Sequence, residues 1–186
     1  AVEKYANLYG VSCGENNALF TNNDSAYETA ISLFHKGINV EAIIDNREEI
    51  DSKLIKETEK NNIKIYKGYT IVNTSGYKRI SNISIMQLSK DGQKVVGSKK
   101  SITCDCLGIS GGWTPAVHLF TQSGGKLQFR DQDQVFIPKK YPSDQISIGS
   151  CAGDFTLDEI SSNVPKTLKE FLNIKKTDYE NLEVQS

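Results

Sequence analysis

The first 66 residues alternate between short apolar runs and longer amphipathic segments. The runs at 17–21 and 40–45 have the length and composition of strands, and the second ends in a carboxylate, Asp45. Between them lie residues spaced to bury one face of a helix: Ala26, Ala30, Leu33 and Phe34. A charged helix is expected near 48–61. Because strand and helix alternate, the pattern predicts a parallel sheet.

The pattern changes after residue 63, where short strands follow one another without helices. Turn signals at 74–76 and 90–93 separate these strands. The expected strands are 63–66, 69–72, 80–88 and 99–109. This order predicts an antiparallel β-meander inserted before the last strand of the parallel sheet.

The region after Gly112 is less regular and rich in turns. The tail from 155 to 186 reads as a helix, a boundary at Pro165, a second helix and a charged end.

Composition narrows the functional class. The 186 residues are 38% hydrophobic with a formal net charge of -1, which is typical of a soluble globular chain and unlike a nucleic-acid-binding one. The longest apolar runs are strand-sized, far short of the ~20 residues that span a bilayer, and no signal peptide is recognisable. We therefore predict a cytoplasmic protein with no membrane partner. Four cysteines without paired metal-ligand spacing predict free thiols and no metal site.

The strand, turn, helix and strand at 17–45 have the layout of a dinucleotide-binding βαβ unit. In such a unit the turn presents backbone N–H groups to a pyrophosphate, and a later acid accepts the ribose hydroxyls. Asp45 lies 23 residues after Asn22, close to the expected ~20. The candidate cofactor-binding residues are Thr21, Asn22, Asn23, Asp24, Ser25, Asp45, Gly111 and Gly112.

The turn departs from the usual glycine-rich form. Asn22 and Asn23 stand where glycines would permit a positive φ and close approach of a phosphate, although asparagine tolerates that conformation better than most residues. Asp24 places a negative charge beside the phosphate position, and it is expected to cap the following helix. Two interpretations stay open: a working NAD site, or a βαβ turn that no longer binds.

Two further positions carry alternatives. The Asp45 charge favours NAD over NADP, but Arg47 could bind phosphate or pair with Asp45 instead. Gly111 and Gly112 follow the end of a strand, where the backbone passes close to a neighbouring element or a ligand.

No residue has the context of a catalytic acid, base or nucleophile. His118 is interpreted as a structural or interface histidine, since no nucleophile or metal cluster accompanies it. Cys104 and Cys106 are expected on one face of a strand as small buried residues.

Three segments in this order carry a resemblance: 20–27 (FTNNDSAY), 110–119 (SGGWTPAVHL) and 122–127 (QSGGKL). An interrupted Rossmann unit ending in Gly-Gly-x-x-Pro resembles the NAD-binding domain of two-dinucleotide flavoproteins. The three segments together resemble the α subunit of heterotetrameric sarcosine oxidase over roughly residues 1–160. That family oxidises sarcosine, transfers the carbon to tetrahydrofolate and reduces oxygen to peroxide.

The resemblance implies an α/β fold: a Rossmann-type parallel sheet with an inserted antiparallel β-meander, plus a returning C-terminal piece of the outer dinucleotide domain. The expected domains are 1–120, of NAD-binding type, and 121–186, the returning segment with C-terminal helices. A complete α subunit also has a glycine-rich dinucleotide motif and a folate-binding domain, which this sequence lacks. Ser150 stands where related flavoproteins have a flavin-contacting Asp, so flavin is expected only in partner subunits.

The resemblance further implies β, γ and δ subunits as partners and an isolated chain that is inactive. NAD, weakly bound or absent, is the one cofactor expected here, and it could belong instead to the glycine-rich unit. The alternatives are a subunit of a related N-methyl amine or dimethylglycine dehydrogenase, a small pyridine-nucleotide oxidoreductase, and an interaction module whose Rossmann fold binds nothing.

Overall fold

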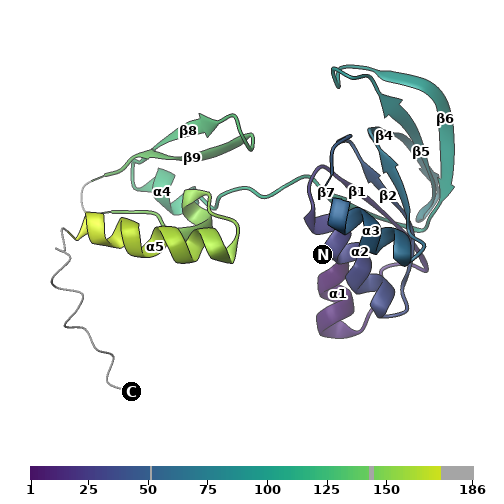
Figure 1. The fold of residues 1–186 in the computed structure, drawn as a ribbon, viewed down its shortest axis with the longest axis horizontal. Helices are drawn as coiled ribbons and strands as arrows, with labels where there is room; N and C mark the ends of the chain where they lie inside the picture. Colours follow the sequence, from purple (N-terminus) through teal and green to yellow (C-terminus); the bar gives the residue numbers. More distant parts are fainter. Residues whose placement is uncertain (51, 143–144, 173–186) are drawn as a thin grey trace. The chain divides into compact units, whose positions relative to one another are not determined.

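A computed structural model describes residues 1–50, 52–142 and 145–172 of the chain. It divides into two compact units, Ala1–Gly112 and Trp113–Ser186, which are described separately below (Figure 1). The predicted domain boundary after residue 120 falls inside helix α4 (His118–Gln122).

The first unit is built on a four-stranded parallel sheet with the order β3-β2-β1-β7. Its strands are β1 (Asn16–Thr21), β2 (Asn39–Asp45), β3 (Lys64–Lys67) and β7 (Cys106–Ser110). Strands β1 and β2 are buried along nearly their whole length, as expected for a parallel sheet covered on both faces. The predicted α/β class with a parallel sheet is confirmed.

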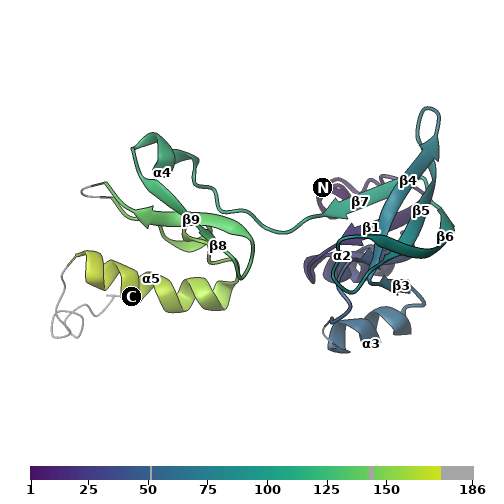
Figure 2. The same ribbon diagram turned by 90° about the horizontal axis from the view of Figure 1, so that it is seen from above.

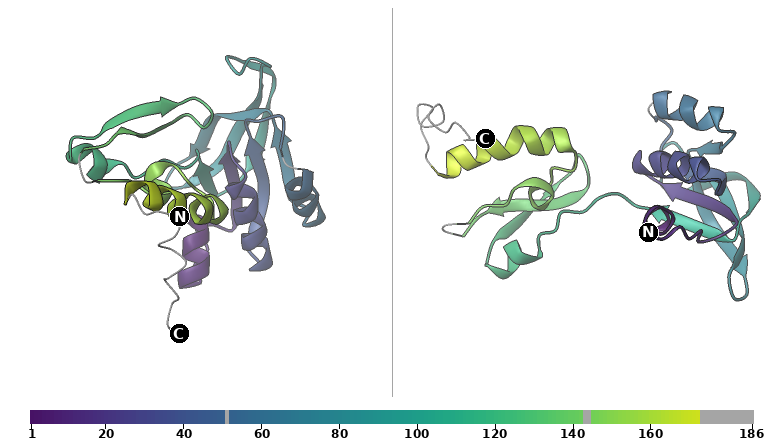
Figure 3. Two further views of the ribbon diagram at one scale, coloured as in Figure 1. Left: turned by 60° about the vertical axis from the view of Figure 1, so that its left-hand side comes forward. Right: turned by 90° about the horizontal axis from the view of Figure 1, so that it is seen from below.

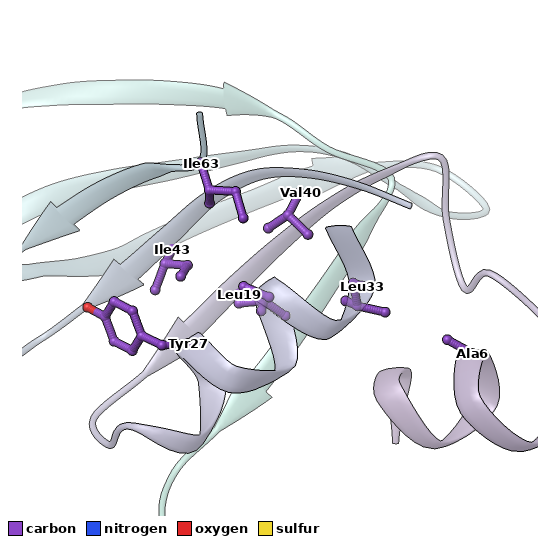
Figure 4. Packing of buried hydrophobic residues seen from close by; sticks show 8 residues of the cluster. Ala6, Leu19, Tyr27, Leu33, Val40, Ile43 and Ile63 are labelled. Atoms are coloured by element: carbon purple, nitrogen blue, oxygen red, sulfur yellow. The ribbon is translucent and has the colours of Figure 1, made fainter. Parts of the chain in front are cut away.

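Helices cover one face of this sheet (Figure 2). They are α1 (Val2–Tyr9), α2 (Ser25–His35) and α3 (Ser52–Lys60). The core under them joins Leu19 and Ile43 from the strands to Leu33 of α2 and Ala6 of α1 (Figure 4). Helix α1 was not expected from the sequence.

The predicted meander covers the opposite face of the sheet. Its strands β4 (Tyr69–Gly76), β5 (Ile80–Leu88) and β6 (Val95–Thr103) pair antiparallel in that order. Ile83 and Ile85 pack there against Ala18 of β1 and Ile44 of β2. The chain then returns to the parallel sheet as β7, next to β1.

One predicted strand is wrong. The run at 99–109 is two strands in two different sheets, β6 and β7, joined by a turn at Cys104 and Asp105. Cys104 is buried against the meander, so the two thiols do not share one strand.

Over its described residues, the second unit contains a hairpin and short or medium-length helices (Figure 3). These elements are α4, β8 (Lys126–Arg130), β9 (Val135–Lys140), the 3-10 helix η1 (Gly149–Ala152) and α5 (Leu157–Phe171). The Arg130 guanidinium links the hairpin to the end of η1 by donating to the carbonyl of Gly153 at 2.8 Å.

Helix α5 begins with a capping box in which Thr156 and Glu159 bond reciprocally. It continues through Pro165, so the predicted boundary at this residue is wrong. The second helix and the charged end predicted for 173–186 lie outside the described residues. Among the helices described, none is both long and apolar enough to span a bilayer.

Candidate functional site

The candidate residues meet where three parallel strands end at the same level. Thr21 of β1 is in register with Asp45 of β2 on one side and with Ser110 of β7 on the other. The turn at 22–24 and the first residue of α2 follow Thr21 directly. Since ligands of open α/β sheets bind beyond the carboxyl ends of the strands, this edge is the candidate site.

The two asparagines of the turn bridge β1 to β7. The Asn22 amide nitrogen donates to the carbonyl of Gly111 at 3.2 Å. The Asn23 amide nitrogen donates to the Ser110 carbonyl at 3.2 Å and to the Ser110 hydroxyl at 3.0 Å. Two neutral side chains thus hold together the strand ends between which a glycine-rich turn leaves room for phosphate.

Asn23 also caps helix α2. Its Oδ1 accepts from the Ser25 backbone N–H at 3.1 Å, and its own N–H donates to the Thr21 hydroxyl at 3.0 Å. Asp24 stands at the N-cap position but makes no side-chain capping bond, so the cap predicted from Asp24 is wrong. Neither asparagine is among the described non-glycine residues with positive φ, so this turn requires no left-handed residue.

Asp45 is completely buried, and both its carboxylate oxygens have partners. Oδ1 accepts from the Arg47 backbone N–H at 2.9 Å and from Arg47 Nε at 3.2 Å. Oδ2 accepts from Arg47 Nη2 at 2.9 Å and from the Tyr27 hydroxyl at 3.1 Å. The pairing with Arg47 that the sequence left open is therefore present.

The charged partners change the acidity of this cluster. The hydrogen bond to Asp45 raises the pKa of Arg47, so the guanidinium stays charged. Burial, with the adjacent Asp45 carboxylate adding to it, raises the pKa of Tyr27 well above that of an ordinary tyrosine. Tyr27 therefore remains a neutral hydrogen-bond donor at physiological pH.

Arg47 also joins the two halves of the site. Its Nη2 donates to Asp24 Oδ1 at 2.7 Å while it holds Asp45. The Arg47 side chain is 31% exposed and that of Asp24 is 50% exposed, so this bridge lies at the surface over the buried Asp45. The negative charge of Asp24 is paired with Arg47 and does not face the turn alone.

The two positions after β7 differ in whether the structure requires glycine. Gly112 adopts a φ of +104°, a conformation that other residues rarely reach. A Cβ at Gly111 would meet no atom within 4 Å, so no protein contact there requires glycine. The Gly111 backbone does pass close to a neighbouring element, because its carbonyl accepts from the Asn22 amide, but a side chain at this position would have room.

The residues present do not fit a bound dinucleotide as they stand. A ribose hydroxyl would need an Asp45 oxygen that Arg47 and Tyr27 already use. A phosphate at the helix N-terminus would need a hydrogen bond from the Ser25 backbone N–H, which already donates to Asn23 Oδ1. The protein's own side chains occupy the hydrogen-bonding positions of both cofactor contacts.

His118 and the cysteines were also considered in the sequence. His118 begins α4 in the second unit and is exposed. In the described part of the chain, no group of three or more His, Cys, Asp or Glu side chains could hold a metal ion. The four cysteines have free thiols, as predicted.

Sequence reasoning missed three participants: Tyr27, Ser110 and the Arg47 contact with Asp24. Tyr27 lies in the first turn of α2, on the helix face that packs over β2, and this position was the available signal. Ser110 ends a strand whose partner could not be assigned without the sheet order.

Solved structures place the fold in a recognised class. The chain is similar to the thioredoxin reductase of T. acidophilum, with a TM-score of 0.56 and 17% sequence identity, and the match covers 85% of this chain and 52% of the other. A flavoprotein disulfide reductase from Escherichia coli matches with a TM-score of 0.60 and 11% sequence identity. This match covers 87% of this chain and 36% of the reductase. A FAD-dependent pyridine nucleotide-disulphide oxidoreductase from Desulfovibrio vulgaris matches with a TM-score of 0.55 and 14% sequence identity. This match covers 89% of this chain and 45% of the oxidoreductase. The fold is that of Rossmann-type flavoprotein oxidoreductases.

Sequence comparison is more specific. The chain is 31% identical over 157 residues to the sarcosine oxidase α subunit of Corynebacterium sp. (strain P-1), covering 83% of this chain and 16% of that protein. The same subunit of Rhizobium meliloti (strain 1021) is 30% identical over 143 residues, which cover 74% of this chain and 13% of that protein. No family model matches the chain.

The resemblance predicted from the three segments is confirmed: this chain is a relative of the sarcosine oxidase α subunit. It spans about a sixth of the length of the curated relatives it matches.

Proposed function

We propose that this chain contributes a dinucleotide-binding-type scaffold domain to an oxidoreductase of the sarcosine oxidase type. In that complex, α, β, γ and δ subunits oxidatively demethylate sarcosine in the cytoplasm and pass the one-carbon unit to tetrahydrofolate. The similarity to sarcosine oxidase α subunits supports this assignment. A complex acting on dimethylglycine or another N-methyl amine has the same support from the fold.

One observation carries the scaffold role: the strand ends are tied to each other by the protein's own side chains. Asn23 links the β1 turn to Ser110, and Arg47 links the same turn to Asp45. The βαβ unit is therefore held in shape without a cofactor. Its work in the complex is to present its surfaces to neighbouring domains and subunits.

A second candidate function is a weak NAD site that opens when Arg47 leaves Asp45. The partial exposure of Arg47 and Asp24 favours this candidate, because the Arg47 side chain can move into solvent together with its ion pair to Asp24. The freed Asp45 carboxylate would accept ribose hydroxyls and repel a 2′-phosphate, so NAD is preferred over NADP.

Thermal unfolding with NAD and with NADP tests the two candidates. A ligand at ten times its Kd stabilises the folded state by about 1.4 kcal/mol, which is a shift of a few degrees in Tm. The scaffold role predicts almost no shift with either nucleotide at about 1 mM, a concentration that would reveal Kd values well below it. A shift of several degrees with NAD alone would establish the second candidate in its place.

The oxidase assignment has its own test. The purified 186-residue chain is expected to hold no flavin and to release no peroxide from sarcosine. Added to a preparation of the β, γ and δ subunits with the rest of the α subunit, it should enter the complex on a sizing column. Stoichiometric flavin in the isolated chain, or its failure to enter the complex, would contradict the assignment.

A further inference from the structure

Two cysteines lie near each other at the opposite edge of the parallel sheet from the candidate site. Cys106 is the first residue of β7, where it is in register with Asn17 of β1. Cys13 is exposed in the segment that connects α1 to β1. Neither residue has a part in the dinucleotide-type site.

The segment that carries Cys13 is fastened beside Cys106. The Asp105 carboxylate accepts from the backbone N–H groups of Glu15 at 3.0 Å and Asn16 at 2.8 Å. These two bonds lower the pKa of Asp105, so the clamp stays charged and intact at neutral pH. Gly14 lies so close that a Cβ on it would be 2.6 Å from Cys106 Cβ.

Alternation along β7 places Cys106 on the same side of the sheet as that segment. Leu107 packs on the meander, whereas a Cβ at Gly108 would point at Leu19 and at Val2 of α1. Because successive strand residues point to opposite faces, Cys106 points with Gly108 toward the helix side. Cys104 is buried on the meander side and is not available to Cys13.

A polar acceptor accompanies Cys106 on this face. Asn17, its register partner on β1, is fully buried, and its Oδ1 has no hydrogen-bond partner in the structure. Such orphaned buried acceptors are uncommon in folded proteins. An acceptor beside Cys106 can receive a hydrogen bond from the thiol and orient it for sulfur chemistry.

We propose that Cys13 and Cys106 form a redox pair that hydrogen peroxide converts into a disulfide. The exposed Cys13 thiolate attacks one peroxide oxygen, the O–O bond breaks, and Cys13 becomes a sulfenic acid as hydroxide leaves. The Cys106 sulfur then attacks the Cys13 sulfur, loses its proton and releases water as the S–S bond forms. The two thiols are oxidised by two electrons, and one peroxide is reduced to two waters.

The environments of the two cysteines assign these roles. Burial raises the pKa of Cys106, so Cys106 stays a thiol and does not compete for the peroxide. A disulfide needs Cα atoms about 4.4–6.8 Å apart, and the closeness of Gly14 to Cys106 brings the preceding residue, Cys13, near Cys106. The bond would tie the α1–β1 segment to the edge strand β7.

The test treats the whole chain with hydrogen peroxide and follows thiols and peptides. The parent should lose two of its four titratable thiols, and peptide mapping should find Cys13 joined to Cys106. The loss should reverse with dithiothreitol. Cys151→Ser, which alters a thiol in the second unit, should form the same bond at the same rate.

Two variants separate the steps. Cys106→Ser should leave Cys13 as a sulfenic acid that a dimedone probe labels, whereas Cys13→Ser should give neither disulfide nor label. Since Cys13 is exposed, Cys13→Ser should fold normally even if Cys106→Ser does not. Oxidation of the parent to sulfinic acid without a cross-link, or a disulfide at Cys104 or Cys151, would overturn the proposal.

Discussion

The two halves of the candidate site use different chemistry at the same edge of the sheet. In the β1 turn, the neutral Asn23 amide bridges to Ser110 at a partly exposed position. At the end of β2, a fully buried carboxylate is held by Arg47 and Tyr27. Removing a partner from a buried charge is far more costly than removing a neutral hydrogen bond. The β1 turn is therefore the adjustable half of the site, meaning the half that tolerates substitution at small cost. The buried Asp45 contact is the half on which the free energy of unfolding depends most.

The largest effect is expected when Arg47 is replaced by methionine. Asp45 would keep the Tyr27 hydroxyl and the backbone N–H of residue 47 but lose its charged partner. The free energy of unfolding should fall by about 3 kcal/mol, measured by urea unfolding. Arg79→Met, at an exposed position, serves as the control and should change little. A loss for Arg47→Met as small as that of the control would show that the buried pair is not the stable half.

A smaller loss is expected for Tyr27→Phe. The hydroxyl donates to a charged acceptor, and such bonds contribute about 1.5–3 kcal/mol, but three donors from Arg47 remain on Asp45. The unfolding free energy should fall by about 1.5 kcal/mol. Tyr77→Phe is the matched control because Tyr77 is 96% exposed. Equal stability of the two variants would remove Tyr27 from the cluster.

The same tyrosine gives the site a pH dependence. Burial and Asp45 raise the pKa of Tyr27 in the folded chain above the ordinary value of 10.0, so the folded state holds its proton more tightly than the unfolded state. Its contribution is complete below about pH 10 and is lost as the pH rises further, when the unfolded state releases the proton first. Unfolding curves against pH should show a steeper alkaline loss in the parent than in Tyr27→Phe. Parallel alkaline limbs would contradict this.

Asn23→Gly probes the adjustable half. It removes the bridge to Ser110 and the cap on Ser25, and should lower the unfolding free energy by about 1 kcal/mol. The loss should be clearly smaller than that of Arg47→Met. If urea unfolding gives the reverse order, the comparison between the halves fails.

The smallest effect is expected for Asp24→Asn. Its carboxylate is half exposed, and exposed ion pairs contribute about 0–1 kcal/mol. Its unfolding free energy should lie within about 0.5 kcal/mol of the parent, and raised salt should reduce the difference further. A loss comparable with that of Arg47→Met would mean that the bridge, and not the buried contact, holds the site.

Much of this architecture could be predicted from local pattern. The spacing of Ala30 and Leu33 located α2, and alternation of strand and helix gave the parallel sheet with its inserted meander. Helix α1 escaped prediction because its apolar side chains Tyr5, Leu8 and Tyr9 are largely exposed, and no side chain caps its start.

The site was less accessible to local reasoning because its contacts join distant residues. The sequence located Asp24 at the start of α2, where aspartate usually caps, but Arg47 draws its carboxylate away. Asn23 takes over the cap because its amide nitrogen is held by Ser110 on β7. Neither outcome follows from the turn's own sequence.

The central claim is that the chain's own side chains occupy the contacts a dinucleotide would use. Calorimetric titration of NAD into the parent, Asn23→Gly and Asp24→Asn tests it most directly. Both variants should bind NAD more tightly than the parent, each by about 1 kcal/mol. Asn23→Gly frees the Ser25 N–H for a phosphate. Asp24→Asn removes a negative charge at a helix N-terminus. Parent binding as tight as that of both variants would contradict the claim.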